Sequence, residues 1–246
     1  MKQFIDATYL KDFSNAVISN DEHEKNVHLL VSQAINHQLK LVMVSPKFVS
    51  IVRKQIDEAQ SKVLVGTVID FPFGTSEQEV KLTEAQRVID LGADELDFVI
   101  NYTAFKKGDI NSVKSEVLNG TAFCLKNHKK VKWIIETAAL TEKEIIQICV
   151  LIKNVVISNF LEKDYQNVFV KSSTGFFVTE NGAPNGATRD AIIMMLENAS
   201  PLPIKASGGI RNYDDADKMI KLGVQRIGTS AVLEIIHQKN ETNSTY

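Results

Sequence analysis

The feature that most constrains the fold is a regular alternation of short apolar segments with stretches that carry helix signals. Eight segments of strand length begin near residues 4, 40, 63, 95, 131, 168, 203 and 226, and a helix-like stretch follows each of them. Such alternation predicts a parallel sheet, and eight units in 246 residues favour an α/β fold of the closed (β/α)8 TIM-barrel type. The alternative is an open doubly wound sheet, but no Gly-x-Gly-x-x-Gly sequence follows the first strand.

The domain organisation is simple because no linker rich in Pro, Gly or Ser interrupts the chain. We therefore expect one domain over residues 1–246, with the polar segment 238–246 as a flexible C-terminal tail. Three helix starts are marked in the sequence. Ser76-x-x-Glu79 and Thr141-x-x-Glu144 are capping-box patterns, and Ser45-Pro46 is typical of a capped helix that begins with proline.

Composition narrows the class of protein and its partners. A formal net charge of −2 and a pI of about 6.2 favour neither a nucleic-acid partner nor a membrane surface. Two cysteines, Cys124 and Cys149, are too few for a disulfide framework, and their spacing does not fit a zinc site. The N-terminus has no apolar signal-peptide region, so we expect a cytoplasmic protein with reduced thiols.

Two lysines stand where predicted strands meet their loops. Lys171 ends the apolar run Val168–Val170, and Lys205 occupies the same place 34 residues later, before Ser207-Gly208-Gly209. That spacing suits neighbouring parallel strands, which lie roughly 4.8 Å apart. If both amines point inward, burial and the like charge lower one pKa and give a nucleophile for a Schiff base. The alternative is that each lysine extends its amine to water.

Further charged residues are predicted on the inner face of the same barrel. Asp6 shares a strand face with Thr8, Asp97 lies in an alternating acidic and apolar strand, and Lys132 lies deeper on the next strand. These residues are candidates for proton transfer beside the two lysines. Asp97 has a structural alternative as an ion-pair partner, and Asp6 with Thr8 has one as a brace of the barrel.

Glycine-rich turns follow the last three predicted strands. Barrels often bind phosphate with the loops after strands seven and eight, because glycine lets backbone N–H groups approach an oxyanion. The predicted phosphate-binding residues are Gly175, Ser207, Gly208, Gly209, Arg211, Gly228 and Ser230. A plain tight turn is the alternative interpretation of the two adjacent glycines.

The motifs Val170-Lys171-Ser172-Ser173-Thr174-Gly175-Phe176 and Lys205-Ala206-Ser207-Gly208-Gly209-Ile210-Arg211 resemble those of deoxyribose-phosphate aldolases. The similarity also includes Ile5–Thr8, Val68–Gly74 and Arg226–Ser230, in the family's order along nearly the whole chain. The resemblance implies a (β/α)8 barrel that reversibly cleaves 2-deoxyribose 5-phosphate to acetaldehyde and glyceraldehyde 3-phosphate. It implies no cofactor and no metal.

The resemblance also implies roles for individual residues. Lys171 would form the Schiff base, Lys205 would tune it, and Asp97 would relay protons. Lys132 would be a third active-site lysine, and Asp6 would lie at the substrate hydroxyl. Tyr246, at the end of the tail, would reach the site as a proton carrier, as a C-terminal tyrosine does in some members of the family.

Ala7 stands where the family usually has histidine, at a position that varies among members. Met43 and Ser45 stand in a stretch that commonly has the sequence Cys-Val-Asn-Pro. These changes leave the aldehyde range of the pocket open. Two other functions also remain as alternatives: another lysine-dependent phosphosugar aldolase, and a non-catalytic barrel that only binds phosphate. The expected partners are a small phosphosugar and a second copy of the chain, with the apolar stretch 145–157 packing on the barrel or forming the dimer face.

Overall fold

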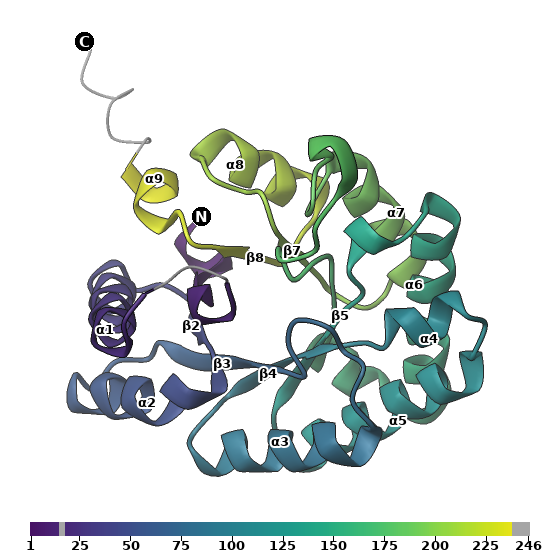
Figure 1. Ribbon diagram of the computed structural model, residues 1–246, viewed down its shortest axis with the longest axis horizontal. Helices are drawn as coiled ribbons and strands as arrows, with labels where there is room; N and C mark the ends of the chain where they lie inside the picture. Colours follow the sequence, from purple (N-terminus) through teal and green to yellow (C-terminus); the bar gives the residue numbers. More distant parts are fainter. Residues whose placement is uncertain (15–17, 238–246) are drawn as a thin grey trace.

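The computed structural model describes residues 1–14 and 18–237, and in it eight parallel strands close into a barrel in the order β1 to β8. The prediction of a (β/α)8 barrel is therefore confirmed. Figure 1 shows the strands at the centre with helices around them. The strands are β1 (Ile5–Tyr9), β2 (Leu41–Val44), β3 (Leu64–Ile69), β4 (Glu95–Val99), β5 (Lys130–Ile134), β6 (Val168–Lys171), β7 (Ile204–Ser207) and β8 (Arg226–Thr229).

The helices follow the strands in the chain, as expected for this fold. They are α1 (Asn20–His37), α2 (Val49–Glu58), α3 (Gln78–Asp90), α4 (Tyr102–Lys106), α5 (Ile110–Lys126), α6 (Glu142–Asn159), α7 (Arg189–Ala199), α8 (Tyr213–Leu222) and α9 (Val232–His237). The barrel closes where β1 pairs with β8, with Asp6 opposite Gly228. In Figure 1 the first and last coloured segments accordingly lie side by side.

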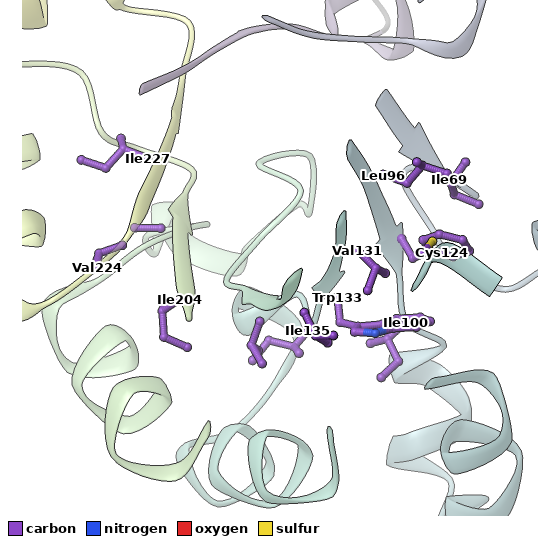
Figure 2. Packing of buried hydrophobic residues seen from close by; sticks show 14 of the residues in the cluster. Ile69, Leu96, Ile100, Cys124, Val131, Trp133, Ile135, Ile204, Val224 and Ile227 are labelled. Carbon is purple, nitrogen blue, oxygen red and sulfur yellow. The ribbon is translucent and has the colours of Figure 1, made fainter. Parts of the chain in front are cut away.

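The apolar core lies between the barrel and the helices. Alternate side chains of each strand point outward, and those of β4 to β8 are almost all Val, Ile, Leu, Phe, Trp or Ala. Figure 2 shows Val131 and Trp133 of β5 and Ile204 of β7 in this layer. The helices bury their apolar faces against it, which holds the strands in place.

The inside of the barrel is filled differently on its two sides. Around β2 and β3 the filling is apolar, with Leu41, Met43 and Val68 packed against Leu10. Around β4 to β8 charged side chains point inward, and they are buried almost completely. Burial of charge is costly unless the groups are paired, so these residues form the candidate site.

The predicted helix starts had different outcomes. The capping box of Thr141 and Glu144 is confirmed, with both reciprocal hydrogen bonds present at the start of α6. The box at Ser76 is wrong: α3 begins at Gln78, and the Ser76 hydroxyl donates instead to Asp70 Oδ1 at 2.7 Å. Asp70 accepts from both the N–H and the hydroxyl of Ser76, so a charged acceptor in the preceding loop holds this serine.

The prediction at Ser45-Pro46 is confirmed in position, because Pro46 begins the helix, but not in the capping bond. Ser45 occupies the N-cap position of a short 3-10 helix, Pro46–Phe48, but its side chain makes no capping hydrogen bond. Its hydroxyl oxygen is buried and has no hydrogen-bond partner among the described residues. By the alternation of β2 it follows Met43 on the inner face, toward the mouth of the barrel rather than toward the helix.

The apolar stretch 145–157 packs mainly on the barrel. Ile145, Ile148 and Ile152 of α6 are buried, whereas Ile146 and Ile157 remain partly exposed. Cys124 and Cys149 are free and buried, and burial raises the pKa of each thiol to about 12. Within residues 1–14 and 18–237, no helix has the length and hydropathy needed to cross a membrane.

Candidate active site

Three lysines point into the barrel from adjacent strands. Lys132 lies on β5, Lys171 is the last residue of β6, and Lys205 lies on β7. The register places Lys171 directly opposite Lys205, and Lys132 directly opposite Asp97 of β4. All three lysines are at most 2% exposed. The predicted pair of inward lysines on neighbouring strands is therefore present in the structure.

Asp97 holds the three amines together. Its Oδ1 accepts a hydrogen bond from Lys132 Nζ at 2.6 Å, and its Oδ2 accepts from Lys171 Nζ at 2.9 Å and from Lys205 Nζ at 2.8 Å. These cations hold the pKa of Asp97 well below its ordinary value despite complete burial. Asp97 is thus an ionised carboxylate at the centre of the site.

A second layer of charges lies beneath these amines. Asp6 Oδ2 pairs with Lys205 Nζ at 2.7 Å, and Asp6 Oδ1 accepts from Arg226 Nε at 2.7 Å. Arg226 also donates two hydrogen bonds to Glu95, at 2.9 and 3.2 Å, and Lys132 lies 2.9 Å from Glu95. This layer supports Lys132 and Lys205 from below.

Glu95 and Arg226 were missed as individual site residues in the sequence. The signal that could have identified them is the period of two along a strand. Glu95 stands two residues before Asp97, and Arg226 stands two residues before Gly228. The missing information was that the floor of this barrel is charged, because barrel interiors are usually filled by apolar side chains.

The charges of the cluster balance when one amine is neutral. Four cationic side chains, those of Lys132, Lys171, Lys205 and Arg226, face the three carboxylates of Asp6, Glu95 and Asp97. An unpaired charge is costly in such a buried place. Lys171 has fewer ion-pair contacts than the other three, since it pairs with Asp97 alone within the described residues.

The electrostatics of Lys171 agree with this count. Burial, opposed by Asp97 and assisted by the charge of Lys205, lowers the pKa of Lys171 to about 8. In contrast, Asp97 and Glu95 raise the pKa of Lys132 above its ordinary value, although burial opposes them. Lys171 is therefore the amine that most readily becomes a neutral nucleophile near pH 7.

A cavity of about 230 Å³ opens above the cluster at the carboxyl end of the barrel. Its wall includes every residue that the sequence predicts for phosphate binding, namely Gly175, Ser207, Gly208, Gly209, Arg211, Gly228 and Ser230. Gly208 and Gly209 have φ angles of 91° and 79°, which suit glycine, and Gly208 lies against Gly186. The loops thus gather the predicted residues at one place, and their binding of phosphate stays a prediction.

Three aromatic rings form an apolar part of the barrel mouth. Phe71 stacks edge-to-face on Phe13 at 4.9 Å and on Phe176 at 5.1 Å between ring centroids. These three rings pack against the inner cluster that contains Leu10 and Met43. Met43 is fully buried there. The methionine that stands where the family commonly has cysteine therefore fills the apolar wall of the barrel.

Glu136 anchors the turn that follows Lys171. It comes just after β5, and it is buried in the left-handed region with φ of 53°, which residues other than glycine rarely adopt. Its carboxyl group contacts the hydroxyls of Ser173 and Thr174. Burial raises the pKa of Glu136, against the effect of these hydrogen bonds.

A larger cavity, of about 880 Å³, lies outside the barrel between α8 and the loop before α7. It shares Gly208 and Gly209 with the smaller cavity, and none of the three inward lysines lines either one. The wall of the smaller cavity, however, includes Thr174, three residues after Lys171, and Ser207, two residues after Lys205 on β7. The chemistry therefore points to the smaller cavity.

Tyr246 and the predicted tail 238–246 lie outside the described residues. No group of His, Cys, Asp or Glu side chains suited to a metal ion occurs in the part of the chain that the structure describes.

Comparison with known proteins agrees with this geometry. A family model described as DeoC/LacD family aldolase matches residues 12–233. The deoxyribose-phosphate aldolase of Thermococcus gammatolerans is 36% identical over 235 residues, which cover 95% of this chain and 94% of the relative. That of Staphylococcus epidermidis is 36% identical over 237 residues, which cover 96% of this chain and 98% of the relative.

Solved structures give the same result. QR15, an aldolase, superposes with a TM-score of 0.77 at 31% identity and covers 98% of this chain and 96% of its own. The deoxyribose-phosphate aldolase of Aeropyrum pernix superposes with a TM-score of 0.78 at 26% identity, covering 98% and 91%.

The chain belongs to the DeoC/LacD family of aldolases, which are carbon–carbon lyases. Within that family it belongs with the deoxyribose-phosphate aldolases, the group of both curated relatives described above.

Proposed function

We propose that the chain cleaves 2-deoxy-D-ribose 5-phosphate to acetaldehyde and D-glyceraldehyde 3-phosphate, reversibly, through an imine on Lys171. The observation that carries the mechanism is the shared contact of Lys171 and Lys205 with one oxygen of Asp97, inside a buried cluster that balances with one neutral amine. Family membership supports the activity, and this contact supports the choice of nucleophile.

The first step uses the low pKa of Lys171. At pH 7 about one-tenth of an amine with a pKa of about 8 is neutral, against less than one-thousandth of an ordinary lysine. The neutral amine adds to the C1 aldehyde of the open-chain sugar, and the carbinolamine loses water to give an iminium. Asp97, already 2.9 Å from Lys171 Nζ, stabilises this cation.

The iminium then acts as an electron sink. A base removes the proton of the C3 hydroxyl, the C2–C3 bond breaks, and its electron pair moves toward the iminium to give an enamine. C3 becomes the aldehyde carbon of glyceraldehyde 3-phosphate. Protonation of the enamine at C2 and addition of water then release acetaldehyde and restore the Lys171 amine.

The proton carriers are proposed from position. Asp97 and Lys205 lie closest to Lys171 and are connected to it by hydrogen bonds, so they can pass a proton to or from the reacting atoms directly or through water. Asp6, paired with Lys205, is placed to hold that amine and the substrate hydroxyl. Lys132 stabilises the charge of Asp97 from the opposite side.

Phosphate binding is assigned to the cavity above β7 and β8. Backbone N–H groups at Gly208 and Gly209, with the side chains of Ser207, Ser230 and Arg211, suit a phosphate. Gly175 lines the same cavity, but its N–H donates to the Ser173 hydroxyl oxygen. Binding energy at this remote group can hold C1 against Lys171 and so raise the rate of imine formation.

Two alternatives to this function make different demands on the site. The apolar wall at Met43 and Phe71 could select another donor aldehyde, which would make the protein an aldolase for a different phosphosugar. A barrel that binds phosphate without catalysis is the second alternative. The balanced charge cluster argues against it, because a binding protein gains nothing from a lysine with a lowered pKa.

The decisive experiment is borohydride trapping with 2-deoxyribose 5-phosphate, followed by mass spectrometry of peptides. We expect a reduced adduct on the peptide that carries Lys171, and we expect Lys171→Ala to lose both adduct and cleavage. An adduct on Lys205 would exchange the roles of the two lysines. A protein that binds the phosphosugar but gives no adduct would be the non-catalytic barrel.

We also propose a cytoplasmic homodimer. The partly exposed Ile146 and Ile157 of α6 are a candidate contact. Sedimentation at several concentrations tests the assembly, and the Aeropyrum pernix relative, described as tetrameric, provides the competing outcome. Cell fractionation tests the location, and recovery in the membrane or secreted fraction would contradict it.

A further inference from the structure

The Ser173 hydroxyl has two neighbouring acceptors, Glu136 and Asn185, when Glu136 is ionised. The Ser173 hydroxyl oxygen lies 2.5 Å from Glu136 Oε1 and 2.9 Å from the carbonyl oxygen of Asn185. The Gly175 N–H donates to the same hydroxyl oxygen at 3.1 Å. Two oxygens therefore compete for the single proton of the Ser173 hydroxyl.

The competition is resolved when Glu136 carries a proton. A backbone carbonyl can only accept, so the Ser173 proton belongs to the bond with Asn185. The short contact between Ser173 and Glu136 Oε1 then needs a proton from Glu136. On the other side, Glu136 Oε2 accepts from the Thr174 N–H at 3.2 Å and from the Thr174 hydroxyl.

The surroundings fit a neutral acid. Glu136 is 1% exposed, and an isolated charge there would be costly. The titratable groups that act on it are Lys171 at the end of β6 and the Tyr102 phenol of α4. Lys171 is paired with Asp97 rather than with Glu136. Burial accordingly raises the pKa of Glu136.

We propose that Glu136 is a protonated carboxylic acid that positions the Ser173–Gly175 turn without placing a negative charge beside Lys171. One carboxyl oxygen donates to Ser173 and the other accepts from Thr174. Through these two residues the acid fixes Gly175 and Phe176, whose N–H groups donate to the Ser173 and Thr174 hydroxyl oxygens.

The absence of charge on the Glu136 side chain is what makes this arrangement useful for catalysis. A carboxylate at the same place would stabilise the Lys171 ammonium and raise its pKa, which would reduce the fraction of neutral amine. A protonated acid holds the turn equally well and leaves Asp97 as the counter-charge of Lys171. This consequence rests on the proposed role of Lys171, whereas the protonation of Glu136 does not.

Infrared difference spectroscopy of the purified protein tests the protonation without reference to activity. The spectrum of the wild type minus Glu136→Gln at neutral pH should contain the C=O stretching band of a protonated carboxyl group. Glu144→Gln is the matched control, because Glu144 also accepts from a threonine hydroxyl but is only partly buried and has a lowered pKa. Its difference spectrum should show carboxylate bands.

A second variant covers the case in which Glu136→Gln does not fold. Ser173→Ala leaves Glu136 in place and removes its hydrogen-bond acceptor, so the protonated-carboxyl band should shift to higher frequency. Carboxylate bands alone, in both difference spectra, would overturn the proposal.

Kinetics tests the positioning role. Glutamine reproduces the donor and the acceptor of the acid, so Glu136→Gln should keep the acid limb of the kcat/KM profile within about 0.3 pH units of the wild type. Glu136→Ala should lower kcat/KM about tenfold, since the turn loses both hydrogen bonds. A limb that moves down by about one unit in Glu136→Gln would show that a negative charge was removed, and it would overturn the proposal.

The two proposals fail in distinguishable ways. Absence of a borohydride adduct in the wild type would reject Lys171 as nucleophile, while the infrared result for Glu136 would stand. A normal adduct together with carboxylate bands alone would reject the neutral acid and keep the imine mechanism.

Discussion

Asp97 shows how one residue can set the properties of several others. Its two oxygens contact Lys132, Lys171 and Lys205, yet these amines have different partners beyond it. Lys132 also reaches Glu95 and Lys205 also reaches Asp6, so each has a second carboxylate. Lys171 has Asp97 alone among the described residues, and it is the one that loses its proton most easily.

The first prediction concerns the pH dependence that follows from Lys171. Its pKa of about 8 means that kcat/KM should rise as pH increases through about 8 and then level off, because the neutral amine is the reactive form. In Lys205→Leu the neighbouring positive charge is gone and Asp97 has one cation fewer, so the pKa of Lys171 should rise. We expect the midpoint of the acid limb of the kcat/KM profile to move up by about one pH unit, as measured in the pH dependence of cleavage.

Lys54→Leu is the control for this prediction, because Lys54 is an exposed lysine of α2 that pairs only loosely with Glu58 at 3.9 Å. Its profile should match that of the wild type. A limb of Lys205→Leu that stays near pH 8 would mean that Lys205 acts as a proton carrier and does not tune Lys171.

Arg211 supports a second prediction at the same scale. It is exposed and lines the smaller cavity with the predicted phosphate residues. Arg211→Ala should raise KM for 2-deoxyribose 5-phosphate about tenfold, since a charge-assisted hydrogen bond is lost, and leave turnover of unphosphorylated 2-deoxyribose unchanged. Arg189→Ala, an exposed arginine outside this cavity, is the control. Equal losses with both sugars would place the phosphate elsewhere.

The sequence could predict the residues of the site better than their contacts. Lys171 and Lys205 were found because each ends or follows an apolar run, and Asp97 because it alternates with apolar neighbours. The sequence could not show that one carboxylate serves three amines, since that depends on the tilt and register of four strands. The proton proposed for Glu136 likewise rests on the distances that join Ser173 to Glu136 and to Asn185.

At the scale of elements, Lys81 connects three parts of the outer layer. It lies on α3, and its ammonium donates to the carbonyl oxygens of Gly74 at 2.8 Å and Val99 at 2.9 Å. It also pairs with Asp70 of the loop after β3 and with Glu116 of α5. This loop carries Phe71, so a buried ion pair outside the barrel fixes an aromatic ring at its mouth.

We predict that Lys81→Met destabilises the protein strongly. The change leaves Glu116 buried without its cation, which typically costs about 3–5 kcal/mol. Denaturant unfolding followed by circular dichroism measures the loss. Lys81→Met with Glu116→Leu should recover part of it, because an apolar pair replaces both charges.

The exposed pair Lys54–Glu58 is the control for this prediction, and Lys54→Met should change the free energy of unfolding by less than about 1 kcal/mol. A Lys81→Met variant as stable as the control would show that water reaches Glu116.

The same elements explain the incorrect capping prediction at Ser76, because Asp70 accepts a hydrogen bond from the Ser76 hydroxyl that was expected to cap α3. A hydrogen bond to a residue outside the helix cannot be predicted from the local sequence pattern.

At the scale of the whole molecule, the barrel is stabilised in two ways at once. Outside the strands an apolar layer packs against the helices, and inside them a chain of ion pairs runs from Glu95 through Arg226, Asp6 and Lys205 to Asp97. The eight-unit alternation predicted the first of these, since it needs only apolar periodicity. The strand positions of Asp6, Asp97 and Lys205 also predicted that they point inward. The sequence did not predict the pairs that they form, because these depend on the register of the strands and on Glu95 and Arg226.

The charges inside the barrel make the free energy of unfolding depend on pH. Lys132 and Arg226 overcome the effect of burial and lower the pKa of Glu95 from 4.5 to about 2, which corresponds to about 3 kcal/mol. A carboxylate with a lowered pKa contributes stability that is fully present above pH 4.5 and is lost as pH falls toward about 2. We therefore predict a steep loss of stability over this range in the wild type.

Glu95→Gln separates this contribution from the rest of the molecule. The variant should be less stable at pH 7, because Lys132 and Arg226 lose a buried counter-charge, and its stability should fall less steeply between pH 4.5 and 2. Urea midpoints across this range measure both effects, with the exposed Glu58→Gln as the control. If Glu95→Gln kept the slope of the wild type, the acid sensitivity would arise from other carboxylates such as Asp97, whose pKa is also lowered, and Glu95 would be no more than a scaffold for Lys132 and Arg226.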